Sequence, residues 1–87
     1  MSWNELKANY IKGHLAKPLM SPKTRLNAFD RIEKLIIAHF PDIIIKPEML
    51  RNIPKSVFKG KLAKYKESGV LNGSEESVIN GIYRLLD

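Results

Sequence analysis

Apolar residues recur at helical spacing in several stretches of the chain, and the first stretch lies at its beginning. Ser2 and Glu5 have the spacing of a capping box, which marks a helix start. An apolar face follows from Trp3 to Leu15. Lys17 precedes a proline, which disfavours helical geometry in the residue before it. The pattern therefore predicts a helix over residues 3–16.

The second stretch predicts the longest helix, over residues 22–40. Serine can cap the free amides of a first turn, and proline at the first helical position loses no hydrogen bond, so Ser21 and Pro22 indicate its start. Pro41 closes it. Its main apolar positions are Leu26, Phe29, Ile32, Ile36 and Phe40.

The segment 43–45 consists of three isoleucines and allows two interpretations. Three β-branched residues favour an extended strand, but a strand needs a partner for its backbone groups, and we find none in the sequence. We therefore expect a buried connector, followed by a short helix that begins at Pro47.

Two further helices complete the predicted fold. One begins at Pro54 and runs to about Ser68, with Gly69 placed to end it. The other has Ser74 as its expected cap and an apolar face from Val78 to Leu86. The prediction is an all-α, compact bundle of four helices plus one short helix, forming a single domain over residues 1–87.

Charge is the most informative part of the composition. Fifteen Lys and Arg residues against nine Asp and Glu give a net charge of +6 and a pI near 9.7. Two windows, residues 6–29 and 49–66, contain several cations and no acidic residue. Such windows favour a polyanionic partner, most often nucleic acid, although lysine also solubilises ordinary helix surfaces.

Few residues offer other chemistry. The chain has no cysteine, which excludes disulfides, thiolate zinc sites and cysteine nucleophiles, and suits a cytoplasmic protein. His14 and His39 have no second ligand at helical metal-site spacing, and no phosphate-binding glycine loop is present. We therefore expect no enzymatic activity, no metal and no cofactor, and the apolar runs are too short for a membrane span.

Three groups of polar residues are candidates for contact with DNA. The start of the second helix offers free amides, hydroxyls and cations to a phosphate, and its arginine and asparagine suit base edges. The start of the last helix offers a similar set. The basic helix 54–68 adds lysines on both flanks of its apolar stripe, which snorkelling around a core would also explain. The candidates are Ser21, Lys23, Thr24, Arg25, Asn27, Lys59, Lys61, Lys64, Ser74, Ser77, Asn80 and Arg84.

The starts of the second and last predicted helices carry short motifs that are similar to those of a known protein family. Met20-Ser21-Pro22-Lys23-Thr24 opens the second helix, and Ser74-Glu-Glu-Ser77-Val78-Ile79-Asn80 opens the last. Together with the order of the helices, they resemble the N-terminal core-binding domain of tyrosine recombinases, the phage integrase family.

The resemblance implies a SAM-like bundle that forms half of a clamp around duplex DNA at a recombination site. Its second and fourth helices would face the DNA. The nucleophilic tyrosine of such recombinases belongs to a separate catalytic domain, so Tyr10, Tyr65 and Tyr83 are not assigned that role. Any self-association would occur through the full-length recombinase on DNA.

A different class of function is compatible with the same charge. A small basic helical protein could bind an acidic protein surface and regulate it, with the cations raising the association rate. Binding of helix 54–68 to a membrane surface is a weaker alternative, because the core needs its narrow apolar arc. The DNA-binding interpretation requires the cationic stretches to fold onto one common side.

Overall fold

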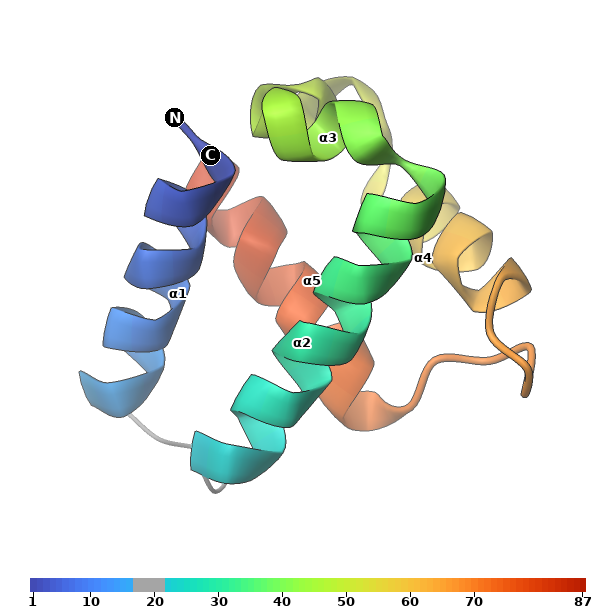
Figure 1. The fold of residues 1–87 in the computed structure, drawn as a ribbon, viewed down its shortest axis with the longest axis horizontal. Coiled ribbons are helices and arrows are strands. Elements are labelled where there is room, and N and C mark those ends of the chain that lie inside the picture. Colours follow the sequence, from blue (N-terminus) through green and yellow to red (C-terminus); the bar gives the residue numbers. More distant parts are fainter. Residues whose placement is uncertain (17–21) are drawn as a thin grey trace.

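The structure is a computed structural model that describes residues 1–16 and 22–87, and it is all-helical within them (Figure 1). This confirms the predicted fold class. Its elements are α1 (Trp3–Ala16), α2 (Pro22–His39), α3 (Pro41–Ile45), the 3-10 helix η1 (Pro47–Asn52), α4 (Lys55–Lys64) and α5 (Gly73–Leu86).

α1 has the bounds that the sequence predicts, α2 ends at His39 instead of residue 40, and the segment after them differs more. Residues 43–45 belong to α3, a short helix with Pro41 in its first turn, rather than to the expected buried connector. Ile43 is buried, whereas Ile45 is 80% exposed. Helical hydrogen bonds satisfy the backbone here, so no partner strand is needed.

The later helices also differ from the prediction at their ends. α4 stops at Lys64, because the chain leaves helical geometry through turns before Gly69, whose φ is 75°. The cap of α5 is Asn72 and not Ser74. The Asn72 side chain accepts a hydrogen bond from the backbone N–H of Glu75, and the Glu75 carboxylate accepts one in return from the N–H of Asn72.

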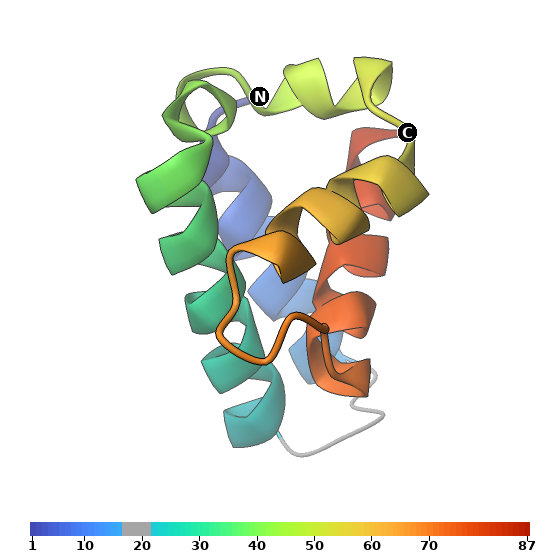
Figure 2. The same cartoon turned by 90° about the vertical axis from the view of Figure 1, so that its right-hand side faces the viewer.

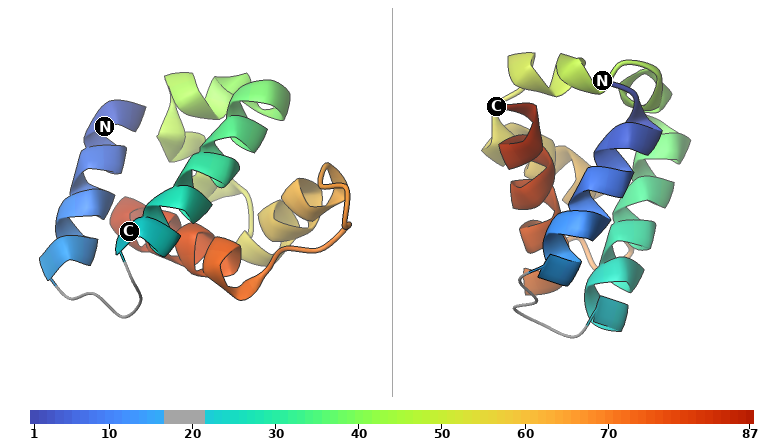
Figure 3. Two further views of the ribbon diagram at one scale, coloured as in Figure 1. Left: turned by 60° about the horizontal axis from the view of Figure 1, so that its bottom comes forward. Right: turned by 90° about the vertical axis from the view of Figure 1, so that its left-hand side faces the viewer.

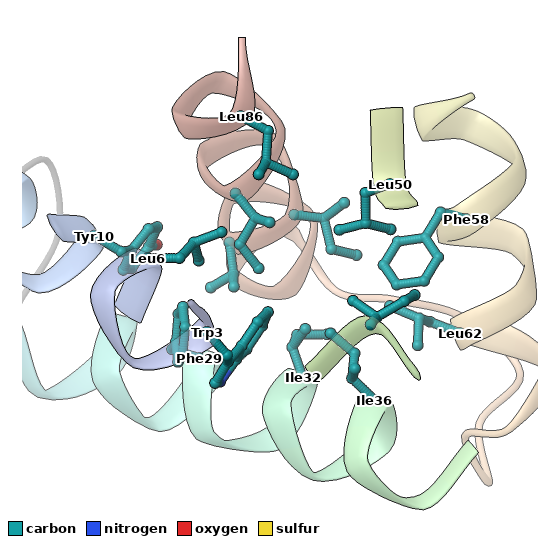
Figure 4. Close-up of a cluster of buried hydrophobic side chains, with 14 of the residues drawn as sticks. Trp3, Leu6, Tyr10, Phe29, Ile32, Ile36, Leu50, Phe58, Leu62 and Leu86 are labelled. Carbon is teal, nitrogen blue, oxygen red and sulfur yellow. The ribbon is translucent and has the colours of Figure 1, made fainter. Parts of the chain in front are cut away.

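α5 lies at the centre of the bundle. α1 and α2 both pack on it, and α1 and α4 lie on opposite sides of the α2–α5 pair (Figures 2 and 3). The core forms where these helices meet and draws side chains from every helix (Figure 4). Its largest fully buried apolar side chains include Leu6, Phe29, Ile32, Ile36, Leu50, Phe58, Leu62, Ile79 and Ile82.

The contact between α1 and α5 is close enough to require a glycine. A Cβ atom on Gly81 would lie 2.6 Å from Cε2 of Tyr10, which is buried. We expect Gly81→Ala to lower the free energy of unfolding by about 1–3 kcal/mol, because the clash outweighs the better helix propensity of alanine. Urea unfolding measures the change.

Gly60, in the middle of α4, is the matched control. A Cβ atom there would meet no atom within 4 Å. Gly60→Ala is therefore expected to raise the free energy of unfolding by about 0.5–1 kcal/mol. If both alanine variants change stability in the same direction, the close approach of α1 to α5 is not as described.

Candidate nucleic-acid interface

The candidate residues at the start of α2 point in different directions. Ser21 lies outside the described residues. Lys23, Thr24 and Asn27 are exposed. Successive helical residues are turned by about 100°, which places Lys23 and Asn27 opposite the buried side of α2. These two side chains are accessible to a partner.

Arg25 has a different environment from its neighbours. It lies on the buried side of α2, one turn before Phe29, and its guanidinium carbon is 5.9 Å from the centre of the Tyr10 ring. Its Nε atom is buried and has no hydrogen-bond partner in the part of the chain that the structure describes. Arg25 is thus packed against α1 and is not positioned to reach a base edge.

The candidates on α5 are mostly covered. Ser74, Ser77 and Asn80 are half-buried, and the Oδ1 atom of Asn80 is buried without a hydrogen-bond partner among the described residues. Only Arg84 is exposed. The polar residues of this helix therefore offer one accessible cation, near the end of α5 rather than at its start.

The α2 and α5 groups do not share a surface. The two helices pack together through buried positions, so their exposed sides face away from each other. Lys23 is also at the start of α2 and Arg84 near the end of α5, at opposite ends of the pair (Figure 1). With α1 and α4 on opposite sides, the described cations of the two basic windows do not form one common concave side.

α4, which carries four lysines, lies on one side of the molecule (Figure 2). Lys55, Lys61 and Lys64 are exposed and Lys59 is half-buried. None of the four forms an ion pair within the described residues, and α4 itself contains no acidic residue. We call the exposed side of α4, with these lysines, the α4 surface.

Small residues occupy the middle of the α4 surface. Phe58 and Leu62 are fully buried and fix which side of the helix faces the core. On the opposite side lie Ser56 and Gly60, while the lysines flank them. A partner could therefore approach the α4 backbone closely, with ammonium groups available on both flanks.

A partly buried hydrogen bond helps to fix α4 relative to α5. The hydroxyl of Tyr83 on α5 donates to the carbonyl oxygen of Ile53, just before α4, at 2.8 Å. Burial raises the pKa of Tyr83 from 10.0 to about 12. Tyr83 thus contributes stability that is complete below pH 10 and is lost as the pH rises towards 12.

We expect Tyr83→Phe to lower the free energy of unfolding by about 1 kcal/mol, since the carbonyl of Ile53 loses its side-chain donor. The variant should also lose less stability than the parent between pH 10 and pH 12. Chemical unfolding at several pH values measures both effects. Equal pH dependence in the two proteins would show that this hydroxyl does not couple to folding.

The two acidic residues at the start of α5 differ in their exposure. Glu75 is only 1% exposed. Its carboxylate accepts hydrogen bonds from Lys66 and from Nε of Arg31, the latter at 3.1 Å. Its charge is therefore compensated inside the fold, and Glu76 is the exposed acid of this turn.

Other acidic residues are also engaged away from α4. Asp30 pairs with Lys34 at 3.0 Å across one turn of α2. Glu33 accepts hydrogen bonds from the Trp3 indole at 2.6 Å and from Lys7 at 3.0 Å, which ties α1 to α2. By contrast, the four lysines of α4 have no acidic partner among the described residues.

Sequence reasoning missed two features near this surface. The Asn72-x-x-Glu75 spacing is itself a capping-box signal, and it was available in the sequence. The ring stack between His39 and Tyr65 joins two helix ends and had no local signal.

Comparisons with known proteins identify no relative. No family model, curated protein or solved structure matches this chain. No described group of three or more His, Asp or Glu side chains could hold a metal ion, and no described helix is long and apolar enough to cross a membrane.

Proposed function

We propose that this protein binds double-stranded DNA and that the α4 surface alone contacts the phosphate backbone, because the described cations of the two basic windows do not share one side. The observation that carries the proposal is the group of four unpaired lysines on one ten-residue helix without an acidic residue. Ammonium groups that lack an internal partner are free to replace the counterions condensed on DNA, and that release favours binding.

The composition of the α4 surface supports backbone contact rather than base reading. Lysine binds phosphate as a point charge, whereas arginine, asparagine and glutamine make the bidentate contacts that distinguish bases. α4 contains none of those three residues. The interaction through this surface should therefore depend little on DNA sequence.

We also propose a more specific function, that of the core-binding domain of a tyrosine recombinase. It rests on the two sequence motifs alone, because the α2 and α5 residues that the resemblance would bring to the DNA do not share a surface. A coding sequence that continues into a domain with a nucleophilic tyrosine would support it. A different downstream domain would leave DNA binding as the proposal without recombination.

Salt dependence of duplex binding tests the proposed function. With about four or five phosphate contacts, the logarithm of the affinity should fall against the logarithm of salt concentration with a slope near −4. Fluorescence anisotropy of a labelled duplex provides the measurement. No binding at low salt would overturn the proposal, and recovery of an acidic protein after nuclease treatment would then favour the regulatory alternative.

A further inference from the structure

Two exposed aromatic rings are stacked beside the α4 surface. The ring centres of His39, at the end of α2, and Tyr65, just after α4, are 3.8 Å apart, and their planes differ by 8°. Tyr65 is 48% exposed, and His39 is also exposed. The pair thus presents to solvent an aromatic surface that does not pack in the core.

A chain of ring contacts fixes this pair to the core. The ring centre of Phe40 lies 5.8 Å from that of Tyr65, edge to face, and 5.7 Å from that of Phe58. Phe58 is completely buried. Because the orientation of Tyr65 is already set by these contacts, a ligand that stacks on the pair would restrict little further motion.

Cations lie next to the stacked pair. Lys61 is four residues before Tyr65, so the two side chains share one side of the helix, whereas Lys64 is turned about 100° away from Tyr65. Neither lysine forms an ion pair with any described residue. Aromatic rings beside a cationic surface are the combination that binds unpaired nucleotides, with bases on the rings and phosphates on the cations.

We infer that the His39–Tyr65 pair stacks with an unpaired nucleobase of a nucleic acid bound to the α4 surface. This inference rests on the proposed function and specifies which structure of DNA the protein prefers to bind. The favoured DNA would have a single-stranded segment adjoining a duplex, because a base within an intact duplex has both faces covered by its neighbours.

The experiment compares two DNA molecules with the same duplex and the same number of phosphates. One carries a single-stranded thymidine tail, and the other carries an abasic tail. We expect the protein to bind the thymidine tail about tenfold more tightly. Tyr65→Leu and His39→Ala should remove most of this difference, whereas Tyr65→Phe, which keeps the ring, should retain it.

A second measurement does not depend on any variant. Stacking of a base should shift the ring-proton resonances of His39 upfield with the thymidine tail and not with the abasic tail. His14, the other histidine in the sequence, serves as the internal reference.

The outcomes separate this inference from the proposed function. Equal, salt-dependent affinities for the two tails would overturn base stacking and leave backbone binding intact. Absence of binding to either DNA, at low salt, would overturn both. A tenfold preference that persists in a folded Tyr65→Leu variant would show that the base is bound elsewhere.

Discussion

Replacing Lys59, Lys61 and Lys64 together by glutamine is expected to weaken duplex binding on the order of 100-fold at low salt. The three side chains supply most of the uncompensated charge of the α4 surface. Each lysine that contacts a phosphate contributes about one to the salt slope, so the slope should become shallower by about 3. Anisotropy titrations at several salt concentrations measure both quantities.

Lysines elsewhere on the protein provide the control. Lys12 on α1 and Lys46 between α3 and η1 are exposed and form no ion pair within the described ranges. Replacing both by glutamine changes the net charge by two but should alter the salt slope little. An equal loss per lysine in the two variants would mean that binding follows net charge and not the α4 surface.

Replacing Glu75 by glutamine is expected to lower the free energy of unfolding by about 2–3 kcal/mol. The carboxylate is buried and connects α5 to Arg31 on α2 and to Lys66 after α4, so its neutralisation weakens three contacts at once. Arg31 is 47% exposed and can be hydrated in the variant, which keeps the loss below that of a fully buried pair.

The same carboxylate should make stability depend on pH in acid. Burial alone would raise the pKa of Glu75, but hydrogen bonds from Lys66, the N–H of Asn72 and Arg31 outweigh burial and hold this pKa below its ordinary value of 4.5. A lowered pKa contributes stability that is present above pH 4.5 and is lost as the pH falls further.

Glu76→Gln is the matched control, because Glu76 is the exposed neighbour of Glu75. Unfolding of both variants at pH 3 and at pH 7 should show reduced acid sensitivity only for Glu75→Gln. If Glu76→Gln had the larger effect, the buried network would not be the source of the acid sensitivity.

The helices themselves could be predicted from the sequence, because apolar spacing and proline positions are local signals. The start of α2 at Pro22 and the extent of α1 follow directly from them. The buried connector expected over residues 43–45 was wrong, because Pro41, which was expected only to end the second helix, also opens the short helix α3.

The arrangement of the candidate site could not be predicted in the same way. Whether Arg25 points towards DNA or towards Tyr10 depends on how α1 packs against α2. The pairing of Glu75 with Arg31 likewise joins residues 44 positions apart, and no local pattern encodes it. The distribution of charge along the sequence indicated a polyanionic partner. Only the packing shows which lysines have no acidic residue paired with them within the fold.

The most direct test of whether α4 contacts DNA is a titration of the isotope-labelled protein with a short duplex, in which the amide chemical shifts are followed. Shifts should concentrate in residues 55–64, with the amide of Gly60 among the largest, while those of α1 stay small. Shifts confined to α1, or to the exposed side of α5 around Arg84, would contradict the assignment of the α4 surface to DNA.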